Sequence, residues 1–176
     1  GTDGVYISNL FISGTEIAVR VVNAAGFRMQ DVRLQAGRGG RIEPDSPNGH
    51  PSTAALSVEN SFELSFLRCQ FYGATATRPS VLLRGLPDLP GQLLSRVPYV
   101  YIVSFRSCSF VNGGVSYVQL AQLDNVAATD FSFVNCLSEQ LAMPLLQVVS
   151  GAVTALSYGK KSSARTLLCS STVYCT

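Results

Sequence analysis

The sequence predicts an all-β protein, a parallel β-helix (a solenoid) of about six coils interrupted by two loop insertions. A short pattern recurs six times: an apolar residue, a middle residue that is polar in five of the six copies, and a second apolar or aromatic residue. The first residues of these triplets, called anchors below, are Leu10, Val32, Cys69, Cys108, Phe131 and Leu156. The third residues should also point inward, and four of them in consecutive coils are aromatic and are expected to form one stack: Phe71, Phe110, Phe133 and Tyr158. No window between Val5 and Val149 shows helical periodicity, whereas short runs rich in β-branched and aromatic residues recur throughout, which favours strands.

The spacing of the anchors indicates stacked repeats. Successive anchors lie 22, 37, 39, 23 and 25 residues apart. The two wide gaps contain Gly37 to Pro51 and Gly73 to Pro98, which are rich in turn residues. If about 15 inserted residues are subtracted from each wide gap, the lengths of all the units fall near the lower end of the ~20–50 residue range of repeat proteins. Such a short unit cannot bury its apolar face alone, so neighbouring units must stack on it.

The strands and coils can be assigned in chain order from alternating apolar residues and turn signals. They are Tyr6 to Ile12 and Glu16 to Val22 in the first coil, Phe27 to Leu34 in the second, Ala54 to Gly73 in the third, Arg78 to Gly85 as a separate strand within the second insertion, and further coils starting at Tyr99, Val118 and Leu145. Asn23 and Asn60 occupy matching bends, where we interpret them as turn formers. A β-sandwich is the alternative arrangement for several short strands.

Two segments carry a resemblance to a known superfamily. Phe66 to Phe71 (FLRCQF) and Phe105 to Phe110 (FRSCSF) resemble repeats of the right-handed parallel β-helices of the pectate lyase-like superfamily. The opening Gly1 to Ile7 is similar to the start of coils in that superfamily. The resemblance covers residues 1–159, and residues 160–176 are expected to form a C-terminal cap or tail. This architecture hosts lyases, hydrolases, phage tailspikes, adhesins and scaffolds, so the fold alone does not assign a function.

The sequence motifs of catalytic members of that superfamily are missing. Polygalacturonases carry Asn-Thr-Asp, Asp-Asp, Gly-His-Gly and Arg-Ile-Lys, but here His50 is followed by Pro51, Ile42 is followed by Glu43, and the other two motifs do not occur. The acid cluster that holds calcium in pectate lyases is not evident either. Gly37 to Pro51 contains two arginines that could cradle an anion, but it lacks the spacing of a phosphate-binding loop.

Composition excludes several classes of protein. Hydrophobic residues make up 47% of the chain and charged residues 14%, which excludes intrinsic disorder. The net charge of +2 is too small to indicate a nucleic-acid partner. No apolar run reaches the roughly 18–20 residues that span a bilayer, so we expect no membrane span. We expect no cofactor and no metal site, since His50 is the one histidine of the chain.

The five cysteines divide into two groups. Cys69 and Cys108 are anchors of adjacent coils, and we expect them to point inward as stacked free thiols, since a buried thiol behaves as a small apolar group. Cys169 and Cys175 are close enough in sequence to form a disulfide, which would indicate an oxidising compartment. The expected location is extracellular, or on the surface of a virion or cell.

Polar side chains flank the anchors and form the candidate binding site. The stacked triplets bring together Asp31, Arg33, Arg68, Gln70, Arg106 and Asp130 on an exposed face. In one interpretation these residues bind a polysaccharide, which a carboxylate pair could hydrolyse. In the other, Asp31 and Arg68 form an exposed cross-strand ion pair of little energetic value.

These observations favour a noncatalytic extracellular module, structural or glycan-binding, that belongs to a larger protein or assembly. The alternative is a polysaccharide lyase or glycoside hydrolase of the pectate lyase-like kind. Val5 to Ile7 begins a strand without a preceding polar cap. We therefore expect the first coil to be covered by other coils of a longer chain or by a partner subunit, because bare strand edges recruit other strands.

Overall fold

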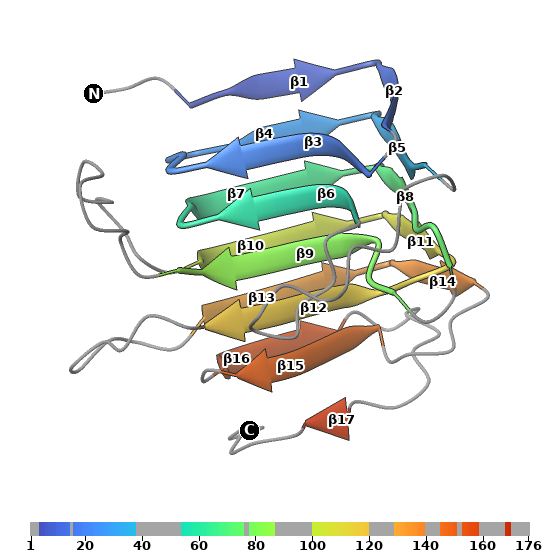
Figure 1. Cartoon of the computed structure of the whole chain (residues 1–176). Coiled ribbons are helices and arrows are strands. Elements are labelled where there is room, and N and C mark those ends of the chain that lie inside the picture. Colours follow the sequence, from blue (N-terminus) through green and yellow to red (C-terminus); the bar gives the residue numbers. More distant parts are fainter. Residues whose placement is uncertain are drawn as a thin grey trace.

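The computed structural model confirms the all-β parallel β-helix (Figure 1). The structure describes residues 4–14, 16–37, 54–75, 78–86, 100–119, 129–139, 145–150, 153–158 and 168–169. These residues form 17 strands and no helix. All paired strands run parallel. The β-sandwich alternative, which requires antiparallel pairing, is therefore wrong.

The strands form three sheets, and each complete coil contributes one strand to each. Sheet A contains β1 (Tyr6–Ser8), β4 (Arg28–Gln30), β7 (Phe62–Leu67), β10 (Tyr101–Arg106), β13 (Thr129–Val134) and β16 (Val153–Tyr158). Sheet B contains β2 (Phe11–Gly14), β5 (Arg33–Ala36), β8 (Gln70–Tyr72), β11 (Ser109–Val111) and β14 (Leu137–Glu139). Sheet C contains β3 (Ile17–Val22), β6 (Ala54–Glu59), β9 (Val81–Gly85), β12 (Val115–Gln119), β15 (Leu146–Ser150) and β17 (Leu168–Cys169).

Five coils are complete, and β16 and β17 belong to a sixth. In Figure 1 the chain runs along sheet A at the back, turns through sheet B and returns along sheet C at the front while it moves away from the N-terminus. This sense of turning is right-handed, as expected for crossovers between parallel strands. The boundary proposed at residue 159 stays a prediction, and β17 adds a short strand to sheet C beyond it.

A column of left-handed residues separates sheet A from sheet B. Asn9 lies between β1 and β2 with φ of 54°, so the single strand predicted over Tyr6 to Ile12 is two strands. The same position in the next four coils has φ between 51° and 54°, and its residues are Asp31, Arg68, Ser107 and Asn135. Asparagine and aspartate tolerate this conformation better than other non-glycine residues. In three of the five coils the residue at this bend is asparagine or aspartate, so its own side chain favours the left-handed backbone.

The asparagines predicted as turn formers lie at the corner between sheet C and sheet A. Asn23 and Asn60 have φ of 53° and 47°. The side chain of Asn60 donates to the Leu86 carbonyl at 3.1 Å and accepts from the Leu86 amide at 2.7 Å. At this bend, the Asn60 side chain makes the two backbone hydrogen bonds that a paired strand would otherwise provide between the coils. Together with the left-handed backbone, this confirms the interpretation of both asparagines as turn formers.

The core contains two aromatic stacks instead of the one predicted. Phe66, Phe105 and Phe133 stack in sheet A, with ring centroids 4.8 and 5.2 Å apart. Phe71 and Phe110 stack in sheet B at 5.3 Å. The predicted single column of Phe71, Phe110, Phe133 and Tyr158 is therefore wrong, because its last two members belong to the other sheet.

That error has one source, the register of the fifth coil. Phe131 was assigned as the anchor that follows Cys108, but Phe131 pairs with Val103 in sheet A. In sheet B, Ser109 pairs with Leu137, so the residue stacked on Cys108 is Cys136. In the fifth coil the apolar alternation lies in the sheet A strand, whereas the sheet B segment Cys136-Leu137-Ser138 lacks it, and a shift of five residues exchanges one strand for the other. The alternation alone therefore cannot fix the register.

Three cysteines continue one inward column. Cys69 and Cys108 are buried free thiols, as predicted, and Cys136 extends the column by one coil. Each thiol donates to a nearby backbone carbonyl, for example Cys108 to Phe66 at 3.4 Å and Cys136 to Phe105 at 3.4 Å. Hydrogen bonds with its two cysteine neighbours, together with burial, raise the pKa of Cys108, so its thiol stays protonated.

The second predicted insertion is shorter than expected. Its strand Arg78 to Gly85 exists as β9, but β9 is the sheet C strand of the third coil and pairs with β6 and β12. The loop Gly37 to Pro51 lies almost entirely outside the described residues. Residues 92–95, where the sequence also allows a short helix, lie outside them too. Cys175 and His50 also lie outside them, so the Cys169–Cys175 disulfide stays a prediction.

Candidate functional site

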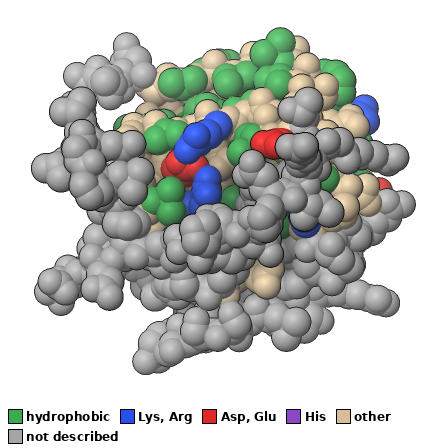
Figure 2. All heavy atoms as spheres, viewed as in Figure 1, with side chains coloured by type: hydrophobic (Ala, Val, Ile, Leu, Met, Phe, Trp, Pro, Cys, Tyr) green, Lys and Arg blue, Asp and Glu red, His purple; other side chains and the backbone are tan. Residues whose placement is uncertain are grey.

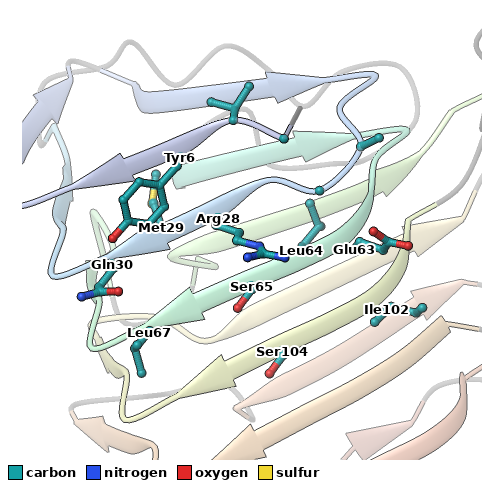
Figure 3. Close-up of a pocket in the computed structure, with 14 residues that line it drawn as sticks. Tyr6, Arg28, Met29, Gln30, Glu63, Leu64, Ser65, Leu67, Ile102 and Ser104 are labelled. Atoms are coloured by element: carbon teal, nitrogen blue, oxygen red, sulfur yellow. The ribbon is translucent and has the colours of Figure 1, made fainter. Parts of the chain in front are cut away.

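A groove of about 840 Å³ crosses the outer face of sheet A over the first four coils (Figure 3). It lies between β1 and β10, and the bend at the start of β4 forms one end. Its described lining residues are Gly4, Val5, Tyr6, Ala25, Gly26, Arg28, Met29, Gln30, Glu63, Leu64, Ser65, Leu67, Ile102 and Ser104. This volume is in the range of small-molecule binding sites.

The strand register arranges the floor of the groove in columns. One column contains Tyr6, Arg28, Ser65 and Ser104, which pair across four successive strands. Figure 3 shows Arg28 beside Ser65, with Ser104 on the following strand. Gln30 and Leu67 begin a parallel column two residues further along the strands. Because alternate residues face outward, the floor offers hydroxyl, amide and guanidinium groups beside one exposed aromatic ring.

One wall of the groove is built on left-handed backbone. Glu63 and Ile102 lie at matching positions near the starts of β7 and β10, with φ of 55° and 52°. The same position in the second coil is Gly26, with φ of 67°. For a β-branched residue such as Ile102 this conformation costs roughly 1–2 kcal/mol. The exposed Ile102 and Glu63 side chains lie along the groove (Figure 3).

The described lining of the groove contains two charged residues, Arg28 and Glu63. Their charges cancel, so this lining has no net charge. Glu63 is its single carboxylate, whereas glycoside hydrolysis ordinarily uses two. Among the described residues of the whole chain, no group of three or more histidine, cysteine, aspartate or glutamate side chains could hold a metal ion.

Four of the six residues predicted as a binding site surround a different hollow. Asp31, Arg33, Arg68 and Gln70 line a depression of about 480 Å³ at the corner between sheets A and B. Arg68 donates to both carboxylate oxygens of Asp31, from Nε at 2.6 Å and from Nη2 at 2.7 Å. The ion pair predicted between these residues is thus confirmed. Two of the charged groups that the polysaccharide interpretation would assign to a ligand are therefore bound to each other.

Arg33 and Gln70 are also engaged with neighbouring side chains. The Arg33 guanidinium lies 4.4 Å from the ring centroid of Tyr72 and 5.4 Å from that of Phe11. Such contacts are favourable because the ring face is electronegative. Tyr72 donates its hydroxyl to Gln70 Oε1 at 3.4 Å. The outer face of sheet B is therefore held together by its own side chains.

The other two predicted site residues lie elsewhere. Arg106 is exposed at the end of β10 and pairs with Leu67, so it continues the second column of sheet A just beyond the groove. Asp130 was predicted one residue before an anchor, in the column of Asp31 and Arg68. That placement is wrong, because Asp130 lies within β13 and the fifth residue of that column is Asn135.

The ion pair makes a testable prediction about pH. Hydrogen bonds from Arg68, with a further one from Gln30, lower the pKa of Asp31 from 3.8 to about 2. Because this pKa is lower in the folded than in the unfolded state, its stabilising contribution is present above about pH 4 and is lost as the pH falls toward 2. An NMR titration of the Asp31 carboxyl carbon should give a midpoint near 2, and Arg68→Gln should raise it. A midpoint near 4 in both proteins would contradict the assignment.

A second charged cluster lies on the outer face of sheet C. Glu59 accepts from Arg20 at 2.8 and 3.2 Å and from Nη2 of Arg84, so one carboxylate bridges three coils. Figure 2 shows these basic and acidic groups stacked on the front face. The Glu59 side chain is only 5% exposed, and both faces of β6 are buried. The cluster is centred on the buried Glu59 carboxylate and links adjacent coils, and it was not predicted from the sequence.

The groove residues Tyr6, Arg28, Gln30, Glu63 and Ser65 were also missed by the sequence analysis. Their outward positions were readable from the alternation in each strand. Their alignment across the coils could not be predicted from the sequence, because it depends on the strand register across two long connections. The left-handed Ile102 had no sequence signal, since isoleucine is among the residues least suited to that conformation.

No protein-family model, no curated protein and no solved structure matches the chain. The three stacked parallel sheets show a parallel β-helix, and the relation to the pectate lyase-like superfamily stays a prediction. Within the described residues, no helix is long and apolar enough to cross a membrane. The predicted extracellular or surface location stays a prediction.

Proposed function

We propose that this chain is a noncatalytic β-helix module that binds a neutral glycan chain in the groove on sheet A. The observation that carries the proposal is the composition of the groove: an exposed tyrosine beside aligned arginine, glutamine and serine side chains, with no net charge in the described lining. Sugar rings combine apolar C–H faces with hydroxyl groups. An aromatic ring can pack against the former, and planar polar groups can hydrogen-bond the latter.

The direction of the groove supports a chain-like ligand. It crosses four strands, so successive sugar units would meet equivalent positions on successive coils. Strained residues are found preferentially at binding sites, and the left-handed Ile102 lies on the wall of this groove. A relation to the pectate lyase-like superfamily is part of the proposal, with the shared architecture as its support.

Binding is favoured over hydrolysis by the acid content of the lining. Retaining and inverting glycosidases place two carboxyl groups on either side of the scissile bond. The described lining provides Glu63 alone. Asp31 is held by Arg68 outside the groove, and Asp130 lies on β13, which contributes no residue to the described lining. We therefore expect the protein to bind glycans without cleaving them.

Isothermal titration calorimetry against a panel of oligosaccharides would test the proposal. The panel should include neutral gluco-, xylo- and manno-oligosaccharides and an oligogalacturonate. We expect binding to at least one neutral member, and we expect Tyr6→Ala and Arg28→Ala each to weaken it about tenfold or more, equivalent to roughly 1.4 kcal/mol. Arg33→Ala, an exposed arginine outside the groove, serves as the matched control and should bind normally.

Three outcomes would contradict this proposal. Absence of binding across the panel would remove the glycan-binding function. Preference for the oligogalacturonate would show that the ligand is acidic. Release of reducing ends, abolished by Glu63→Gln, would show that the protein is an enzyme, the alternative raised by the sequence.

A further inference from the structure

The two charged side chains of the groove belong to adjacent strands of sheet A. Arg28 lies on β4 and Glu63 on β7, and the strand register pairs Arg28 with Ser65, two residues after Glu63. Both side chains are exposed and line the groove, one in the floor and the other along the wall (Figure 3). Because β4 and β7 each have a neighbouring strand on both sides, this arrangement does not depend on where the sheet begins.

These two charges do not neutralise each other in an ion pair. Among the described residues, the ion pairs are centred on the carboxylates of Glu59 and Asp31, and neither Arg28 nor Glu63 takes part in one. An exposed guanidinium offers a planar fork of N–H donors that matches a carboxylate. The floor of the groove would therefore attract an acidic sugar if Arg28 were its only charged residue.

The backbone at Glu63 does not explain why an acid occupies this position. The matching residues of the second and fourth coils are Gly26 and Ile102, so Glu63 is the one charged residue of this left-handed column in the three coils. Its φ of 55° is a conformation that glycine, asparagine and aspartate adopt more readily than glutamate. A residue held in a conformation that its side chain disfavours indicates a role beyond the local turn.

We propose that Glu63 determines the charge specificity of the groove by excluding acidic sugars. The inference rests on the glycan-binding function proposed above, and it names the class of glycan that the groove rejects. Glu63 is one strand and two residues away from Arg28, within the roughly 10 Å over which charges act at moderate salt. A uronate that approaches Arg28 is therefore repelled by the Glu63 carboxylate, whereas a neutral hydroxyl is not. Arg28 remains free to donate hydrogen bonds to that hydroxyl.

Two exposed glutamates provide a matched pair of variants. Glu63→Gln keeps the size of the side chain and removes its charge. Glu139→Gln makes the same change at the exposed end of β14 in sheet B, outside the described lining of the groove. Both variants change the net charge of the protein equally, so an effect confined to Glu63→Gln arises in the groove. Because both side chains are exposed, neither substitution should disturb folding.

Isothermal titration calorimetry with oligogalacturonate and with its methyl ester, the same sugar chain without the charges, tests the proposal. We expect Glu63→Gln to bind oligogalacturonate at least about fivefold more tightly than the wild type does. This gain should fall as salt is added, because salt screens the attraction to Arg28, and it should disappear when Arg28→Ala is added to Glu63→Gln. Binding of the methyl ester, and of the neutral oligosaccharide that the wild type binds, should change less than about twofold in Glu63→Gln. Glu139→Gln should bind all three as the wild type does.

The role of Glu63 and the glycan-binding function fail in different ways. Wild-type binding to a neutral oligosaccharide, without a gain for oligogalacturonate in Glu63→Gln, would overturn the role of Glu63 alone. An equal gain for the methyl ester, or in Glu139→Gln, would also overturn it, because the effect would not come from a charge in the groove. Loss of neutral binding in Glu63→Gln would show that Glu63 contacts the sugar directly instead of excluding acids. Absence of binding to every oligosaccharide, in the wild type and in Glu63→Gln, would contradict both proposals.

Discussion

Replacement of Phe105 by alanine is expected to lower the free energy of unfolding by about 3–5 kcal/mol. Phe105 is fully buried and stacks between Phe66 at 4.8 Å and Phe133 at 5.2 Å. It also meets the edges of Phe71 and Phe110 at 6.0 and 5.3 Å, so it joins the two aromatic stacks of the core. Alanine would leave a cavity that the closely stacked coils cannot fill, because each backbone is fixed by its neighbours.

Urea unfolding monitored by circular dichroism would measure this effect. The matched control is Phe11→Ala, since Phe11 is exposed on sheet B and contributes only a ring contact to Arg33. We expect the control to cost less than about 1 kcal/mol. Equal losses in the two variants would show that the aromatic stacks do not form the core described above.

Replacement of Glu59 by glutamine is expected to cost about 3 kcal/mol or more, the second large effect. Glu59 is buried between Arg20 and Arg84, and the Arg84 side chain is only 20% exposed. Glutamine keeps the size of the side chain but removes its charge, which leaves the Arg84 guanidinium without a counterion. An uncompensated buried charge is far more costly than the loss of an exposed pair.

The exposed ion pair provides the control for this prediction. Asp31→Asn removes a carboxylate from a pair in which Arg68 is half-exposed, so its partner is left in contact with water. We expect a much smaller change in the unfolding midpoint than for Glu59→Gln. If the two substitutions had similar effects, the cluster on sheet C would not hold the coils together.

Part of this architecture could be predicted from the sequence because it depends on local patterns. Alternation identified the strands, and the spacing of turn residues identified the coils. The asparagines at positions 23 and 60 were read correctly because their left-handed conformation has a local chemical cause. The pair of Asp31 and Arg68 was found because the register between the second and third coils was assigned correctly.

The rest depended on information that no single strand contains. Phe131-Ser132-Phe133 fits the triplet, whereas Cys136-Leu137-Ser138, the segment that pairs in sheet B, does not, and choosing the first moved Asp130 into the wrong column. The groove on sheet A is formed by residues from four coils, so it becomes visible only when the register is known. Glu59 and its two arginines lie in three coils as well. A buried cluster of this kind has no signature within one strand.

The strand register is therefore the central claim, since the groove, the aromatic stacks and the column of buried cysteines all follow from it. Nuclear Overhauser contacts between backbone protons of Ser104 and of Ser132 in an isotope-labelled sample would test it most directly. The structure pairs these residues in sheet A and pairs Ser109 with Leu137 in sheet B, so both contacts are expected. Contacts between Ser109 and Ser132, or the α-proton pattern of antiparallel strands, would contradict the account.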